Sequence, residues 1–169
     1  HGMTSLSWDR HQGHASGYDV VELGFNYRID EIRSAIGRVQ LRKLAAGNEH
    51  RAKLTTLYRE LLGELIPQVI MPFRETWGTS CYHILPVILP SGTDRQKVME
   101  TLKTRGIQTS IHYPPIHRFS TFEVDWKKRS FPLPITEEAC TRELTLPLFS
   151  SMKTEQVQFV VENLKEVLN

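Results

Sequence analysis

Cysteine, long apolar runs and net charge are all scarce in this sequence, and each shortage excludes a class of protein. Two cysteines in 169 residues, without a CxxC pair, exclude a disulfide-rich scaffold. We expect Cys81 and Cys140 to be free thiols in a reducing cytoplasm, although a single bridge between them stays open. No apolar run approaches the roughly 20 residues that span a bilayer, and no signal peptide is visible. The sequence therefore predicts a cytoplasmic protein with no membrane partner.

The charges are nearly balanced and are interleaved along the chain. The formal net charge is +2, from 21 basic and 19 acidic residues. This charge is too small and too scattered for a nucleic-acid footprint, and the basic run at residues 127–129 reads as a solvated loop. A composition of 40% hydrophobic and 24% charged residues is typical of a globular protein. We expect one ordinary domain with a substantial core and no nucleic-acid partner.

Several catalytic and binding motifs are also missing. Neither GxGxxG nor GxxxxGK[ST] occurs, so the known nucleotide loops are absent. There is no GxSxG elbow for a nucleophilic triad, and Cys81 begins an apolar segment, where a thiol is usually a small core residue. Seven histidines are present without HExxH; His11 and His14 lie on a glycine-rich stretch, and two prolines separate His112 from His117. We expect no metal site.

A helical period in the apolar residues appears after residue 28. Two stripes show it, Ile29, Ile32, Ile36 and Val39, then Leu54, Leu57, Leu61 and Leu65. Asp30 is the predicted N-cap, since its carboxylate can accept from free backbone N–H groups of the first turn. Gly47 and Asn48 either bend one long helix or separate two helices. We favour one bent helix that Pro67 ends.

Short strands and helices alternate after Pro67. Residues 81–90 are apolar and β-branched, which predicts a strand, and Pro86 within it predicts an edge position or a bulge. Residues 93–105 predict a helix with Gly106 at its C′ position. The remaining predicted elements are a strand at 107–111, a loop at 112–119 imposed by two adjacent prolines, a helix at 135–143, a strand at 144–147 and a helix at 153–168. We predict an α/β fold in which helices pack on one face of a small sheet.

The first 28 residues are expected to be irregular, because they are polar, rich in glycine and begin without an initiator methionine. This start is expected of the middle of a longer protein, or of a fragment of one. The expected organisation is therefore an irregular segment at residues 1–28, which continues from a missing upstream large domain, and a C-terminal small domain at residues 29–169.

Asn26, Tyr27 and Arg28 place an amide, a phenol and a guanidinium directly before the predicted helix. Helix N-termini favour anions through their free N–H groups and the helix dipole, and arginine offers phosphate a two-pronged donor. The cluster therefore suits an anion. A structural turn is the alternative, in which Tyr27 packs, Arg28 pairs with Asp30 or Glu31, and Asp30 itself occupies the cap.

Residues 24–41, GFNYRIDEIRSAIGRVQL, match a long motif, G-x-N-Y-R-[ML]-[TS]-[DE]-[IL]-x-[AS]-A-[IL]-G-x-x-Q-L. Further matches follow in order: HGM from His1, YHxxPVxL at 82–89, RxxVxxxLxxxGI at 95–107, HYxPxH at 112–117, and FP with ExxxxxxLTLPLFxxM at 131–152. Together these motifs resemble the DegT/DnrJ/StrS-type sugar aminotransferases, a branch of the fold-type I enzymes that use pyridoxal 5′-phosphate. The resemblance covers nearly the whole chain.

In that family, these motifs belong to the C-terminal portion of the protein only. The resemblance therefore implies the small domain of a fold-type I aminotransferase with a long N-terminal helix. The Ser-x-x-Lys lysine that holds the cofactor is absent, since Lys43, Lys53, Lys97 and Lys103 lie on helical faces and do not match it. No catalytic residue is therefore assigned. The chain alone is expected to be inactive, whereas the full-length parent would move an amino group from glutamate to a keto group of a nucleotide-linked sugar.

The resemblance also assigns binding roles. Asn26 is expected to reach across a homodimer interface to the cofactor phosphate of the neighbouring subunit, with Arg28 beside it. Tyr27, and the loop that carries His112, Tyr113 and His117, are expected to line the substrate pocket, although packing of Tyr113 between prolines stays open. Polysaccharide, lipopolysaccharide and antibiotic sugar biosynthesis all fit. The alternative is a standalone module without the lysine, which dimerises, regulates or binds sugar without turnover.

Overall fold

The computed structural model describes residues 4, 19–25, 27–75, 78–122 and 131–168, and it divides the chain into two compact units. One unit is His1–Arg42 and the other is Lys43–Asn169. The division falls inside a helix, whereas the domain boundary expected from the sequence lies at residue 28. Asn26, the N-terminal histidines and the basic run at 127–129 lie outside the described residues.

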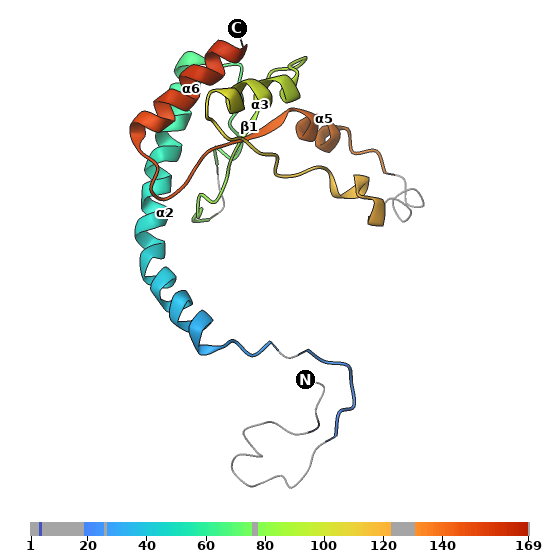
Figure 1. The fold of residues 1–169 in the computed structure, drawn as a ribbon. Helices are drawn as coiled ribbons and strands as arrows, with labels where there is room; N and C mark the ends of the chain where they lie inside the picture. Colours follow the sequence, from blue (N-terminus) through green and yellow to red (C-terminus); the bar gives the residue numbers. More distant parts are fainter. Residues whose placement is uncertain (1–3, 5–18, 26, 76–77, 123–130, 169) are drawn as a thin grey trace. The chain divides into compact units, whose positions relative to one another are not determined.

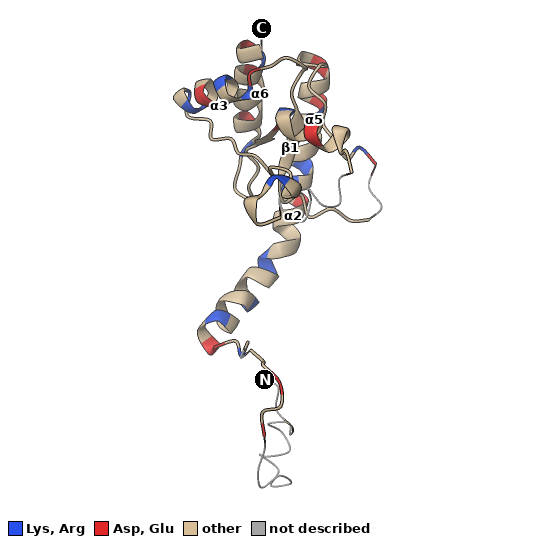
Figure 2. Cartoon of the chain, turned by 90° about the vertical axis from the view of Figure 1, so that its right-hand side faces the viewer, with Lys and Arg blue, Asp and Glu red and all other residues tan. Residues whose placement is uncertain are grey.

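Helix α2, Glu31–Leu65, is one continuous helix through Gly47 and Asn48, which confirms the single-helix prediction (Figure 1). Asp30 caps its start, since Asp30 Oδ1 accepts from the backbone N–H of Arg33 at 2.8 Å. Basic residues recur along the helix in Figure 2.

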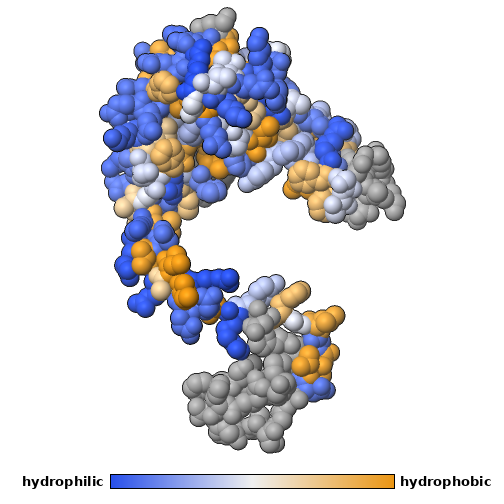
Figure 3. Space-filling view, in the orientation of Figure 1, coloured by the Kyte–Doolittle hydropathy of each residue, from blue (hydrophilic) through white to orange (hydrophobic). Residues whose placement is uncertain are grey.

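The two apolar stripes of α2 have different surroundings. On the C-terminal half, Leu54, Tyr58 and Leu62 are buried. On the N-terminal half, Ile32 and Ile36 are 75% and 57% exposed, and apolar surface is visible there in Figure 3. The helical period therefore predicted both apolar stripes of α2, but it did not predict which of them is buried by the rest of this chain.

The sheet consists of two antiparallel strands, β1 (Leu85–Ile88) and β2 (Glu143–Leu146), with Leu85 opposite Leu146 and Ile88 opposite Glu143. The strand predicted at 107–111 is wrong. In its place there is one isolated bridge, in which Ser110 and Thr145 exchange backbone hydrogen bonds of 3.1 and 2.8 Å. The chain does not extend this pairing because Pro114 and Pro115 follow within a few residues and exclude a ladder.

Strand β1 is also shorter than the predicted 81–90, so Cys81 precedes the strand and is exposed. Pro86 sits opposite Thr145, and on the other side of β1 the described residues pair only at the isolated bridge between Ile70 and Ile88. This confirms the edge position that a proline without an N–H requires. Both cysteines are free thiols, as predicted.

Helices α3 (Arg95–Thr104), α5 (Pro134–Arg142) and α6 (Thr154–Leu168) follow in the predicted order, and a short 3-10 helix, η1 (Ile116–Arg118), lies between α3 and α5. Helix α3 ends at Thr104, and Gly106, whose φ is +78°, lies at the C′ position as predicted. The N–H of Gly106 bonds the carbonyl of Lys103 and that of Ile107 bonds the carbonyl of Leu102, which is the Schellman arrangement. A left-handed residue is required there, and glycine adopts this conformation without steric cost.

One hydrophobic core joins the C-terminal half of α2, the sheet, α3 and α6. On α6 the buried residues are Val157, Val160, Val161 and Leu164, as their spacing predicts. Leu85 and Val87 of β1 and Leu144 and Leu146 of β2 belong to the same core. Glu143 and Thr145, which alternate with them on β2, are buried too, so both faces of this short strand are covered. None of the helices in the described ranges is both long and apolar enough for a bilayer.

Candidate functional site

The start of α2 carries the polar cluster singled out in the sequence. Tyr27 is 86% exposed, and its ring lies 5.6 Å from that of Phe25. Arg28 is exposed beside it. The carboxylate of Asp30 pairs with Arg33, its Oδ2 lying 3.3 Å from Arg33 Nε. Asp30 thus occupies one backbone donor of the first turn, as the structural alternative expected, while the side chains of Tyr27 and Arg28 stay at the surface.

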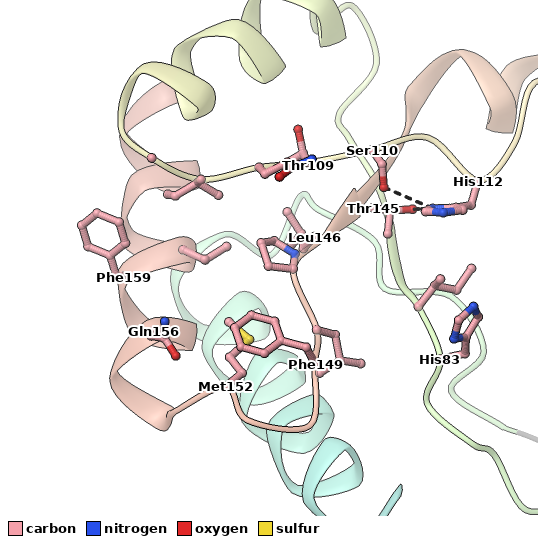
Figure 4. A pocket seen from close by; sticks show the side chains of 17 residues that line it. His83, Thr109, Ser110, His112, Thr145, Leu146, Phe149, Met152, Gln156 and Phe159 are labelled. Carbon is pink, nitrogen blue, oxygen red and sulfur yellow. Dashed lines mark hydrogen bonds between the residues drawn. The ribbon is translucent and has the colours of Figure 1, made fainter. Parts of the chain in front are cut away.

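In the second unit, a cavity of about 590 Å³ lies between α6, β2 and the segment that follows α3 (Figure 4). His83 and His112 line it together with Thr145, so two sequence-distant histidines meet one cavity. Apolar walls come from Phe149 and Phe159 among others. A mostly apolar hollow with a few polar groups is the usual form of a small-molecule site.

His112 is held by a chain of hydrogen bonds to β2. Its backbone N–H donates to Glu143 Oε2 at 3.0 Å, and its ring Nδ1 lies 2.9 Å from Thr145 Oγ1. The hydroxyl of Thr145 donates in turn to Glu143 Oε1 at 2.5 Å. Ser110 Oγ lies 3.3 Å from the same ring nitrogen (Figure 4). The imidazole therefore has a fixed orientation at the wall of the cavity.

Tyr113 stands beside His112 and is 65% exposed. The two rings meet edge to face, with centroids 4.7 Å apart and planes at 78°. These two predicted substrate-side residues, which are neighbours in the sequence, are therefore in ring contact. An exposed phenol next to a held imidazole offers both an apolar face and hydrogen-bonding groups.

His117 lies on η1 and points toward α5. Its Nε2 is 2.5 Å from Glu137 Oε1, which also accepts from Arg118 Nε at 2.9 Å, and the side chain of His117 is 9% exposed. These contacts fasten the loop to α5. The predicted role of His117 in substrate binding stays a prediction.

This fastening is expected to depend on pH. The hydrogen bonds from Arg118 and then His117 hold the pKa of Glu137 below its ordinary value of 4.5. Because the folded pKa is lowered, the contribution to stability is present above that ordinary value and is lost as pH falls through the folded pKa. As pH falls through this lowered pKa, we expect η1 to detach from α5 before the core unfolds, measured as a shift of the Arg118 Nε–H resonance.

The control is Glu137→Gln, which should remove this pH dependence and show the detached resonance near neutral pH. An unchanged Arg118 resonance across the acid range in the unaltered protein would contradict the fastening role.

Glu143 and Thr145 were not identified from the sequence as site residues. The sequence predicts Glu143 at the end of a helix and a short strand at residues 144–147. The alternation Glu-Leu-Thr-Leu does contain a signal, because side chains one apart on a strand point to opposite faces. Two polar residues on one face of a buried strand need partners.

Among the described residues no cluster of three or more histidine, cysteine or acidic side chains could hold a metal ion. Cys140 is half-buried, and burial raises the pKa of its thiol. This is opposite to the direction that activates a nucleophile.

Comparison with known proteins places the whole chain in one group. A model of the DegT/DnrJ/EryC1/StrS aminotransferase family matches residues 1–165. The dTDP-4-dehydro-2,3,6-trideoxy-D-glucose 4-aminotransferase of Saccharopolyspora spinosa is 30% identical over 171 residues, which cover 99% of this chain and 43% of that protein.

Two solved structures show the same fold. PseC of Helicobacter pylori, an aminotransferase involved in the biosynthesis of pseudoaminic acid, has a TM-score of 0.82 at 24% identity and matches 99% of this chain and 43% of its own. A proposed sugar aminotransferase of Streptococcus pneumoniae, in its PMP form, has a TM-score of 0.81 at 22% identity and matches 99% and 42%. The likeness confirms the predicted α/β fold, and the chain spans less than half the length of each of these relatives.

Proposed function

Because the chain belongs to the DegT/DnrJ/EryC1/StrS aminotransferase family, we propose that it is the C-terminal part of an enzyme that aminates nucleotide-linked sugars. The proposed reaction moves an amino group from glutamate to a keto group of the sugar. The observation that carries this proposal is the family match over residues 1–165, together with a sugar aminotransferase relative aligned to 99% of the chain.

Pyridoxal phosphate is the proposed cofactor, and a PMP form among the similar structures supports it. When bound, this group supplies the electron sink that amino transfer needs. The residues present fit its phosphate: Tyr27 and Arg28 are exposed donors at the start of α2, and arginine suits phosphate oxygens. We propose that Asn26 and Arg28 hold the phosphate, with Asn26 donated to the neighbouring subunit of a homodimer.

A homodimer is further supported by the N-terminal half of α2. Ile32, Ile36 and Val39, which lie on one face of the helix, are 75%, 57% and 38% exposed. Contiguous apolar surface of this kind usually marks an interface. The first apolar stripe identified in the sequence would then be covered by other protein rather than by this chain's own core.

For the sugar we propose the cavity that His112 lines, with the ring of Tyr113 against that of His112. The apolar walls exclude water from one side of a ligand, and the imidazole and phenol offer hydrogen bonds to hydroxyl groups. These residues bind and orient the substrate, and orientation alone contributes strongly to rate. Tyr27 and His117 remain further proposed substrate contacts.

The test uses the full-length protein, purified with pyridoxal phosphate. We expect an absorbance band from the lysine-bound cofactor, and consumption of glutamate only when a nucleotide-linked ketosugar is supplied. A protein without the band and without ketosugar-dependent glutamate consumption contradicts the proposal. Tight binding of the nucleotide sugar by such a protein would favour the alternative, a sugar-binding module without turnover.

A further inference from the structure

Two buried side chains of β2, Glu143 and Thr145, lie between the core and His112 at the cavity wall. They are only 7% and 5% exposed. Glu143 uses both carboxylate oxygens, one for the backbone N–H of His112 at 3.0 Å and one for the hydroxyl of Thr145 at 2.5 Å. A buried carboxylate with this pair of partners forms a defined acceptor.

The protons available in this series of hydrogen bonds determine which nitrogen of the His112 imidazole is protonated. A threonine hydroxyl has one proton, and Thr145 donates it to Glu143. Thr145 Oγ1 can then only accept from His112 Nδ1, which lies 2.9 Å away, so Nδ1 must carry the ring proton. Ser110 Oγ, at 3.3 Å, is a second and more distant partner of that nitrogen.

The other ring nitrogen, Nε2, has no hydrogen-bond partner among the described residues. His112 is also one of the residues that line the cavity. No carboxylate in the described part of the chain contacts Nε2 to favour a second proton there. The ring thus presents a lone pair. A hydrogen bond on one imidazole nitrogen commonly sets the role of the other.

We propose that Glu143 and Thr145 are positioning residues that hold His112 in its Nδ1–H tautomer, so that Nε2 accepts a hydrogen bond from a hydroxyl of the sugar substrate. The identity of that ligand rests on the proposed function; the tautomer does not. An unprotonated Nε2 would select among ligands, because a hydrogen-bond acceptor at this position favours ligands that present an O–H or N–H group there.

The test compares the ring nitrogens of His112 by NMR in 15N-histidine-labelled protein at about pH 8, above the ordinary pKa of imidazole. His112→Gln assigns the resonances. In the unaltered protein we expect the proton on Nδ1 and a bare Nε2. A proton on Nε2 instead would overturn the proposal.

Glu143→Gln is expected to reverse this state. The amide oxygen must face the backbone N–H of His112, so the amide NH₂ takes the place of Oε1 and donates to Thr145. The hydroxyl proton of Thr145 then turns to Nδ1, and the ring proton moves to Nε2. The experiment is made in a Ser110→Ala background, because Ser110 could otherwise keep the proton on Nδ1.

The matched control is Glu138→Gln on α5, whose side chain is 64% exposed and pairs with Arg142. It should leave the tautomer unchanged. If Glu143→Gln does not fold, Thr145→Val is the second variant, since valine suits a strand and keeps the shape without the hydroxyl. We expect a mixture of tautomers for Thr145→Val and a normal state for Thr145→Ser. An unchanged tautomer in the folded Glu143 or Thr145→Val variant would overturn the proposal.

A kinetic measurement separates this proposal from the proposed function. In an active enzyme that carries Ser110→Ala, adding Glu143→Gln should raise KM for the sugar about tenfold, as expected for one lost hydrogen bond, and leave KM for glutamate unchanged. A tautomer that reverses in a protein without sugar amination would leave the positioning role standing and contradict the proposed function. An equal change in both KM values would contradict the role of Nε2 toward the sugar.

Discussion

Replacing Leu62 with alanine is expected to lower the free energy of unfolding of residues 1–169 by about 2–5 kcal/mol. Leu62 is 1% exposed and belongs to the core that α2 shares with the sheet and α6. Truncation removes buried methyl groups and leaves a cavity that the packed neighbours only partly fill. Denaturation by urea, followed by the helical circular dichroism signal, measures the loss.

The matched control lies on the same helix. Ile36 is 57% exposed, so Ile36→Ala should change the free energy of unfolding by no more than about 0.5 kcal/mol. The contrast tests the finding that the two apolar stripes of α2 have different surroundings in this chain. Equal effects of the two substitutions, measured at a concentration where the chain is monomeric, would show that the N-terminal stripe is also covered within the chain.

Replacing Asn26 with alanine is expected to weaken binding of pyridoxal phosphate to the full-length protein about tenfold to a hundredfold. Hydrogen bonds to charged groups contribute about 1.5–3 kcal/mol, and a phosphate oxygen is such an acceptor. Arg28→Ala should have an effect of similar size, because arginine offers phosphate paired donors. A fluorescence titration of the protein with the cofactor measures the dissociation constant without reference to turnover.

Arg33→Ala serves as the control for this second prediction. Its side chain is 79% exposed and pairs with Asp30 at the same helix start, so it removes a nearby positive charge without removing the proposed contacts. We expect less than about a twofold change, as for other exposed ion pairs. If Asn26→Ala and Arg33→Ala bind the cofactor equally well, the assignment of Asn26 to the phosphate is wrong.

Local features of the fold were predictable from neighbouring residues. The N-cap at Asp30, the glycine that ends α3 and the buried face of α6 all depend on groups within a turn or two of helix. These predictions are confirmed. They could be made from the sequence because capping and helical periodicity depend on residues that are close together along the chain. The edge position of β1 followed from the missing N–H of Pro86.

Pairing between distant segments was less predictable. The strand expected at 107–111 was wrong, since a short apolar run does not tell how many backbone groups find partners. In the same way, Glu143 and Thr145 could be placed together on the face opposite to Leu144 only after the strand boundary was known. A shift of one residue would have turned each of these side chains to the other face.

The amino-acid sequence alone determined the order of the helices, the resemblance to sugar aminotransferases and the polar cluster before α2, because each is written in residues close together along the chain. Only the tertiary structure decided that half of the α2 stripe is exposed and that His112, thirty-one residues from Glu143, depends on that carboxylate. Burial and hydrogen bonds between residues this far apart in the sequence depend on how the chain packs. A local sequence pattern therefore does not predict them.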